Sequence, residues 1–229
     1  MRIGVVLSSG GSAFAQVSKM LANIPAKEHD FVVVTDRECG AEDFCIANHV
    51  KHQRIQWTNN KDFSVAAAKY FKESEVDYVI LFFSRLVTAE LYRTLPAFNV
   101  HPALLPAFKG INAVERAWKS DVRFFGTTLH LVDETVDGGA IVAQVIIPVL
   151  PEYTLEMMHK LSYIQKVYVF LLFIELIETG ALIVSEDYLR IEIRRDLSCT
   201  DRSNPCLLDP QFLEAFMEFQ RQEGLEVVI

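Results

Sequence analysis

Two short stretches of the chain hold the residues best suited to chemistry. Asn99 and His101 are two positions apart in an apolar segment, so on an extended strand both side chains leave the same face. Pro102 and Pro106 keep the following backbone extended, because proline fixes its own φ and disfavours helix in the residue before it. Asp137 opens an Asp-Gly-Gly turn and supplies the carboxylate that an imidazole needs. An amide, an imidazole and a carboxylate predict a site that polarises a carbonyl group and moves a proton.

The segments that must position these residues predict alternating strands and helices. Short apolar runs indicate strands over residues 3–7, 31–35, 78–83, 98–101, 125–132 and 140–149, with one or two more within 184–194. Apolar residues at helical spacing indicate helices over 13–22, 61–74, 154–178 and 209–222. This order predicts an α/β fold, a Rossmann-like doubly wound and mostly parallel sheet. Asn99 and His101 then lie at the carboxyl end of a strand, where open sheets bind ligands.

A glycine-rich loop follows the first predicted strand. Gly10, Gly11 and Ser12 connect that strand to the first helix. Strand, glycine loop and helix together point backbone N–H groups and a helix dipole at an anion. The loop has no G-x-G-x-x-G spacing, so a nicotinamide-dependent oxidoreductase is only a weak alternative.

Composition narrows the class of protein and its partners. The 229 residues are 51% hydrophobic and 23% charged, as in a globular protein, and the net charge of -8 argues against non-specific nucleic-acid binding. The four cysteines have no metal-binding spacing, which favours free thiols in the cytoplasm and no metal site. Residues 167–174 are the most apolar stretch but are too few to span a membrane. We therefore expect small-molecule partners, no nucleic acid, no membrane, and a monomer or homodimer.

The motifs, taken in order, resemble the folate-dependent formyltransferase family, most closely its purine-synthesis branch. The resemblance is strongest over residues 99–149, where Asn-Val-His-Pro, Leu-Leu-Pro, Phe-Lys-Gly and Asp-Gly-Gly follow one another, and it reaches back weakly to residues 3–12. It implies the formyltransferase fold over residues 1–196, with residues 197–229 as a C-terminal extension packed on it. It also implies an enzyme of one-carbon metabolism that transfers a formyl group from 10-formyltetrahydrofolate to a primary amine.

The resemblance also implies roles for individual residues. Asn99 would donate a hydrogen bond to the oxyanion, and His101, if protonated, would stabilise the same charge. Asp137 would favour the imidazolium and position a water that relays the proton. His130 stays open between a core role and a site role. The residues expected along the folate are Arg85, Leu86, Val87, Asp133, Glu134, Thr135 and Val136.

The acceptor pocket departs from the family pattern. The family's Gly-Asn-Gly-Ser-Asn loop corresponds here to residues 9–13, which keep Gly11 and Ser12 but have neither asparagine. A family glutamate that binds ribose hydroxyls corresponds to Lys166, which can only donate hydrogen bonds. We expect Gly10, Gly11, Ser12 and Lys166 to bind the amine substrate. Glycinamide ribonucleotide and a nucleotide-linked amino sugar both stay open as acceptors. So does water, which would make the protein a 10-formyltetrahydrofolate hydrolase. A non-catalytic folate-binding protein is disfavoured by the intact Asn99, His101 and Asp137.

Overall fold

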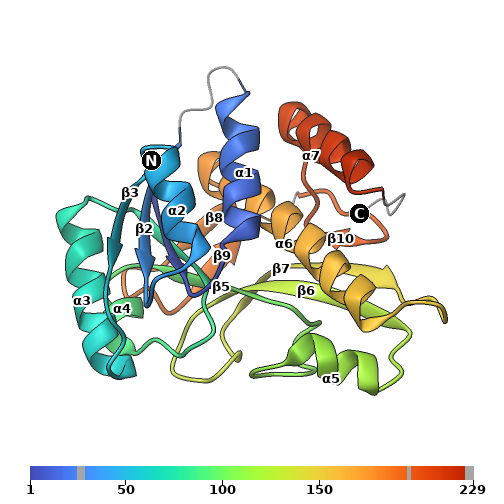
Figure 1. Ribbon diagram of the computed structural model, residues 1–229, viewed down its shortest axis with the longest axis horizontal. Helices are drawn as coiled ribbons and strands as arrows, with labels where there is room; N and C mark the ends of the chain where they lie inside the picture. Colours follow the sequence, from blue (N-terminus) through green and yellow to red (C-terminus); the bar gives the residue numbers. More distant parts are fainter. Residues whose placement is uncertain (25–28, 195–196, 225–229) are drawn as a thin grey trace.

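The computed structural model describes residues 1–24, 29–194 and 197–224, and one eight-stranded sheet forms its centre (Figure 1). Its strands are β1 (Arg2–Leu7), β2 (Asp30–Thr35), β3 (Lys51–Arg54), β4 (Tyr78–Phe82), β5 (Ala97–His101), β6 (Phe124–Leu131), β7 (Ile141–Pro148) and β10 (Ser203–Asn204). They lie in the order β10-β7-β6-β5-β4-β1-β2-β3. Neighbours from β5 to β3 are parallel, whereas β6, β7 and β10 pair antiparallel. A separate two-stranded sheet joins β8 (Leu182–Val184) to β9 (Ile191–Ile193).

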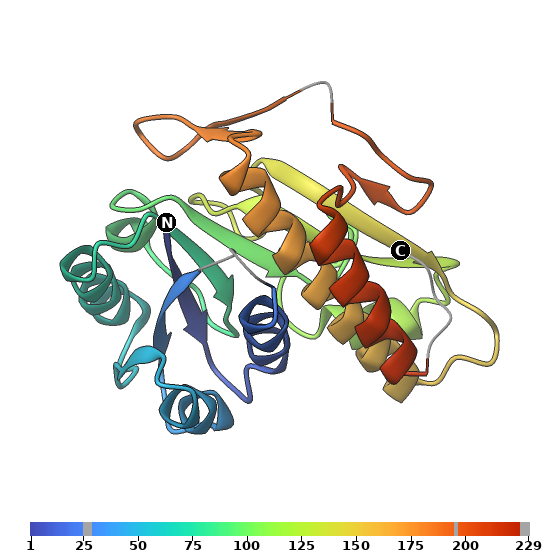
Figure 2. The ribbon, with the colours of Figure 1, turned by 90° about the horizontal axis from the view of Figure 1, so that it is seen from above.

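Helices cover both faces of the sheet. They are α1 (Ser12–Ala22), α2 (Gly40–Ala47), α3 (Asn60–Glu73), α4 (Ala89–Tyr92), α5 (Ala113–Lys119), α6 (Leu155–Glu178) and α7 (Pro210–Gln222). Residues of α1, α2, α6 and α7 share one hydrophobic core, which includes Val33 of β2. The neighbouring Val32 and Val34 belong to a second core with α3, because successive side chains of a strand point to opposite faces. Figure 2 shows α1 and α6 side by side, with α7 along the outer side of α6.

The long helix α6 is buried on nearly all sides. Every side chain from Val167 to Ile177 is buried, because the helix lies between the sheet and the helices α1, α5 and α7. The Thr154 side chain caps its first turn by accepting the Met157 N–H at 3.3 Å. Gly180 follows its last turn with a φ of +64°, the left-handed conformation that glycine adopts at little cost. Among the described helices, none is long and apolar enough to cross a membrane.

The predicted α/β fold and mostly parallel sheet are confirmed. The ten predicted strands and helices with stated bounds are found with their ends within one residue. Of the strands expected within 184–194, β9 lies inside that range and β8 overlaps it only at Val184. The elements missed are α2, β3, α4, α5 and β10. Of these, β3 has no apolar side chain to reveal a strand, while α4 and β10 are only four and two residues long. The predicted boundary at residue 196 falls outside the described residues, and the division there stays a prediction. The segment after it adds β10 to the main sheet and packs α7 on α6.

Candidate active site

One cavity of about 710 Å³ lies where β1, β4 and β5 end, and it brings together the three residues predicted to do chemistry. Asn99 and His101 come from β5, and Asp137 comes from the loop between β6 and β7. The antiparallel register of β5 and β6 sets Asn99 opposite His130. The following loop then brings Asp137 within 3.3 Å of the Asn99 amide. The cavity therefore joins parts of the chain that the sequence keeps far apart.

The Asn99 side chain is held between two residues of the site. Its Nδ2 donates to Asp137 Oδ1 at 3.3 Å and lies 3.2 Å from His130 Nε2. The other ring nitrogen of His130, Nδ1, lies 2.8 Å from the Leu131 carbonyl oxygen, and its Nε2 also lies 3.5 Å from Asp137 Oδ1. Both distances from the Asn99 amide exceed the usual hydrogen-bond length of about 2.9 Å, so both hydrogen bonds are weak. Asn99 therefore loses little hydrogen-bond energy when its amide turns to a reacting oxygen.

His101 is buried, and each of its ring nitrogens faces an acceptor. Nε2 lies 3.0 Å from the Phe108 carbonyl oxygen, and Nδ1 lies 3.3 Å from Asp137 Oδ2. Burial lowers the pKa of His101 below its ordinary value, although Asp137 and the Phe108 carbonyl oppose that shift. A neutral ring has one hydrogen for these two acceptors, whereas a protonated ring donates to both. His101 is thus suited to take up a proton during a reaction more than to carry one permanently.

Asp137 is the negative centre of the site. Its Oδ2 accepts the Gly110 N–H at 2.7 Å. Burial opposes ionisation of this carboxyl, but the His130 ring, the Gly110 N–H and the His101 ring lower its pKa to about 2. Asp137 is therefore a carboxylate throughout the neutral range.

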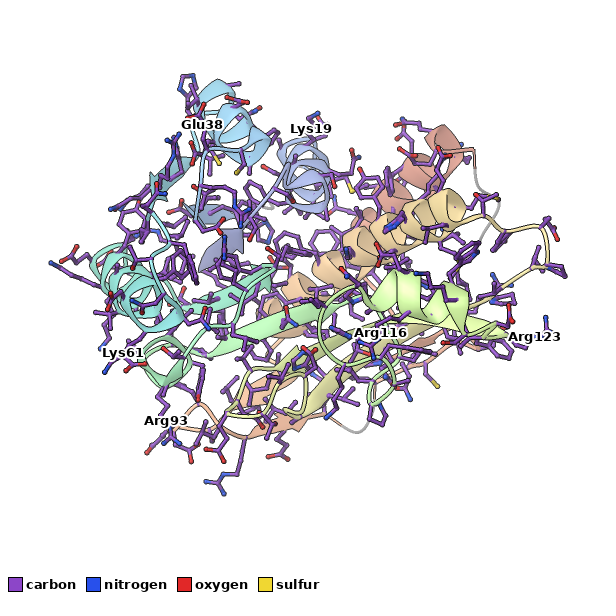
Figure 3. The ribbon with its side chains drawn as sticks, turned by 60° about the horizontal axis from the view of Figure 1, so that its bottom comes forward. Lys19, Glu38, Lys61, Arg93, Arg116 and Arg123 are labelled. Carbon is purple, nitrogen blue, oxygen red and sulfur yellow. The ribbon has the colours of Figure 1, made fainter. Side chains whose placement is uncertain are left out.

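Left-handed backbone shapes the turn that follows β5. Phe108 and Gly110 have φ values of +54° and +84°, and a bulky side chain such as that of Phe108 rarely takes this conformation. Arg116 of α5, labelled in Figure 3, reaches back to this turn and donates from Nη1 to the Lys109 carbonyl oxygen at 2.6 Å. The turn thus holds in place the Phe108 carbonyl and the Gly110 N–H that contact the site.

The two glycines after Asp137 have no room for a side chain. A Cβ on Gly139 would lie 1.9 Å from the Leu131 carbonyl oxygen, and one on Gly138 would lie 2.2 Å from Thr135 Oγ1. Close packing against the end of β6 therefore requires glycine at position 139, and close packing within the loop requires glycine at position 138.

The seven residues predicted along the folate line the same cavity, and their role stays a prediction. Arg85 donates from Nε to the buried Asp36 at 2.7 Å, and its guanidinium lies 4.1 Å from the centre of the Trp57 ring. Leu86 and Val136 are 51% and 48% exposed, which gives this part of the cavity an apolar edge. The full set is Arg85, Leu86, Val87, Asp133, Glu134, Thr135 and Val136.

Three of the four residues predicted to bind the amine also line the cavity. Gly11 and Ser12 lie at the start of α1, and Lys166 reaches the cavity from α6. Gly10 is not among the lining residues, and its binding role stays a prediction.

Sequence reasoning left His130 undecided and missed two backbone groups, the Gly110 N–H and the Phe108 carbonyl. His130 is both a buried residue and a neighbour of Asn99 and Asp137. The observation that places His130 in the site is its position opposite Asn99, and this position is known only once β5 and β6 are paired. No cluster of His, Cys, Asp or Glu in the described part of the chain could hold a metal ion.

Comparison with known proteins agrees with this geometry. Residues 1–168 match the profile of the family described as formyl transferase. The chain belongs to the formyl transferase family. A phosphoribosylglycinamide formyltransferase of Haemophilus influenzae is 35% identical over 106 residues, which cover 45% of this chain and 50% of that protein. The chloroplastic phosphoribosylglycinamide formyltransferase of Vigna unguiculata is 30% identical over 167 residues, which cover 68% of this chain and 54% of that protein. The chain thus spans about half the length of these curated relatives.

Solved structures share the fold over a longer part of the chain. Glycinamide ribonucleotide transformylase 1 from Symbiobacterium toebii superposes with a TM-score of 0.76 at 27% identity, covering 84% of this chain and 93% of that one. A formyltetrahydrofolate deformylase from Pseudomonas syringae superposes with a TM-score of 0.74 at 16% identity, covering 84% of this chain and 65% of that one. The second likeness shows the fold alone.

Proposed function

We propose that this formyl transferase moves a formyl group from 10-formyltetrahydrofolate to a primary amine. The observation that carries the proposal is the contact of Asn99, His101 and Asp137 in one cavity of a chain that belongs to this family. Glycinamide ribonucleotide is the first acceptor to test, because the relatives' names specify it. With that acceptor the enzyme would act in purine biosynthesis.

The geometry supports a division of labour among the three residues. Formyl transfer to an amine forms a bond from nitrogen to the formyl carbon and passes through a tetrahedral carbon that carries an oxyanion. Asn99 turns one amide hydrogen from Asp137 or His130 to that oxygen, which stabilises the charge as it develops. The amine loses a proton and the departing folate nitrogen gains one, so the carbon–nitrogen bond to the folate breaks without a net change in protons.

His101 and Asp137 supply the path for that proton. The buried, neutral ring of His101 takes it up, and the Asp137 carboxylate at 3.3 Å stabilises the imidazolium that results. Because the pKa of Asp137 is about 2, the carboxylate keeps its charge through this cycle. The water relay expected from the resemblance stays part of the proposal, with Asp137 as its anchor.

The folate would occupy the apolar part of the cavity. Leu86, Val87 and Val136 offer the apolar contacts that a flat ring system needs, beside the polar loop residues Asp133, Glu134 and Thr135. Arg85 lies at the same side, with its charge already shared with Asp36. We propose that Arg85, which keeps Asp36 as its counterion, also pairs with the glutamate part of the folate.

The experiment is to follow release of the deformylated folate by absorbance, with glycinamide ribonucleotide present or absent. Turnover that depends on the acceptor supports the transferase. Equal turnover without it would indicate a hydrolase instead. The variant Asn99→Ala is the control: it should lower turnover about 100- to 1000-fold in either reaction, and such a loss excludes a contaminating enzyme as the source of the activity. The proposal would be overturned if turnover were absent in both arms and also with a panel of other amines.

We also propose that the protein works in the cytoplasm as a monomer or homodimer. All four cysteines are free, which suits a reducing compartment. The plant relative named as chloroplastic marks an organelle as the alternative. Sedimentation of the purified protein, with fractionation of the source cells, tests both statements.

A further inference from the structure

Lys166 is a charged residue of the cavity that the proposed transfer step does not use. It lies on α6 and shares the cavity with Ser12, Asn99 and His101. Its charge is near enough to His101 to contribute to the lowering of the pKa of that ring. A cation so placed acts on whatever part of the acceptor lies next to the reacting amine.

Within the described part of the chain, Lys166 has no counterion of its own. Among the described residues it makes no hydrogen bond and no ion pair within 4.0 Å, and burial lowers its pKa. The one carboxylate that raises its pKa is Glu115 of α5, and Glu115 lies 3.3 Å from His159 Nε2. Burial of an ammonium group without a partner costs desolvation energy. A ligand that supplies a negative charge beside the group offsets this cost and therefore binds more tightly.

The protein around Lys166 favours an anion. Figure 2 shows α6 beside α1, and Gly11 and Ser12 at the start of α1 line the same cavity as Lys166. The first turn of α1 carries no acidic side chain and has no side-chain cap. The acidic residues of the cavity lining belong instead to the loop of residues 133–137, and none of them belongs to the first turn of α1.

We infer that the amine formylated at this site carries an anionic oxygen group, a phosphate or a carboxylate, and that Lys166 selects for it by direct pairing. The inference rests on the proposed formyl transfer. It makes Lys166 a residue that determines specificity, separate from the groups that handle the oxyanion and the proton. Acceptors that present only neutral groups at this position are expected to react poorly.

The test uses two pairs of primary amines that differ in one group. The first pair is a phosphate monoester and the corresponding alcohol, for example glycinamide ribonucleotide and its dephosphorylated riboside. The second pair is an amino acid and its primary amide. Comparing kcat/KM within each pair shows whether an anion is required, and comparing the pairs shows whether it is a phosphate or a carboxylate.

The variant Lys166→Met keeps the length of the side chain and removes its charge. We expect it to lower the preference for the anionic member over the neutral one by about 10- to 100-fold, mainly through KM, because a charge-assisted hydrogen bond is lost. Lys166→Arg should recover part of that preference. Lys160→Met is the matched control on the same helix, since Lys160 pairs with Glu223 at 3.4 Å and is absent from the cavity lining. It should leave the preference within about twofold of the wild type.

A second readout does not depend on turnover. The amine of Lys166 is labelled with a limiting amount of an acylating reagent, in the presence of orthophosphate, acetate or chloride, and the labelled site is quantified by mass spectrometry. Orthophosphate or acetate should protect Lys166 but not Lys160, because a bound anion raises the pKa of the amine it contacts.

The outcomes separate the two proposals. If no amine is formylated while the anion still protects Lys166, the proposed formyl transfer is overturned and the proposed anion site is supported. If neutral and anionic amines react equally, or Lys166→Met weakens both members of a pair alike, the transferase stands and the specificity inference is overturned. Absence of protection by either anion likewise overturns it.

Discussion

Replacing Asp137 by Asn should destabilise the protein in a way that depends on pH. The pKa of this carboxyl falls from 3.8 to about 2 in the folded protein. A shift of that size corresponds to roughly 2 kcal/mol of folding free energy. Since the folded pKa is the lower one, this stabilisation is complete above pH 4 and is lost as the pH falls toward 2. Asparagine adopts left-handed backbone readily, so the φ of +47° at this position adds no cost.

The assay is urea unfolding of the wild type and the variant at pH 7, 4 and 3. The difference in the free energy of unfolding between the two proteins should be roughly 2 kcal/mol at pH 7 and about half of that at pH 3. Asp133→Asn in the same loop is the control, because its Oδ1 accepts from the Thr135 N–H at 2.8 Å and an amide oxygen can do the same. Its difference from the wild type should stay within about 0.5 kcal/mol. A difference for Asp137→Asn that is absent at pH 7, or unchanged at pH 3, would refute the electrostatic reasoning.

Three further predictions concern the same site. Asn99→Ala should lower kcat by about 100- to 1000-fold with little loss of stability, and near-normal turnover would remove the amide from the mechanism. Since burial lowers the pKa of His101 from 6.5, kcat/KM should fall with decreasing pH only below that value, as the ring becomes protonated beforehand. His101→Asn should remove this limb of the pH profile, and a limb above pH 6.5 would contradict the assignment. Gly139→Ala should lower the melting temperature more than Gly138→Ala, because its Cβ meets the Leu131 carbonyl oxygen instead of the movable hydroxyl of Thr135. Equal melting temperatures would count against this packing explanation.

The local sequence was sufficient for most of the fold. Continuous apolar runs such as residues 3–7 and 78–83 marked strands buried on both faces, because a parallel sheet covered by helices leaves no polar side. The strand over Lys51–Arg54 escaped because it lies at the edge of the sheet, where its four polar side chains face solvent or loops. Short helices such as α4 escaped because a single turn has too few residues for a periodic pattern.

For the site, the sequence predicted which residues take part, and the tertiary structure decided their environment. Spacing of two placed Asn99 and His101 on one face of a strand, and two glycines identified the Asp137 turn. Only the pairing of β5 with β6 brought His130 against Asn99 and turned Asp137 from a turn residue into a buried carboxylate with a pKa of about 2. Only the packing of α6 beside α1 showed that Lys166 lines the cavity and finds no counterion among the described residues. The physical reason is the distance along the chain over which each effect acts. Backbone periodicity depends on a few consecutive residues, so the sequence alone reveals it. Burial, charge and hydrogen bonding depend on groups that the chain brings together from distant positions.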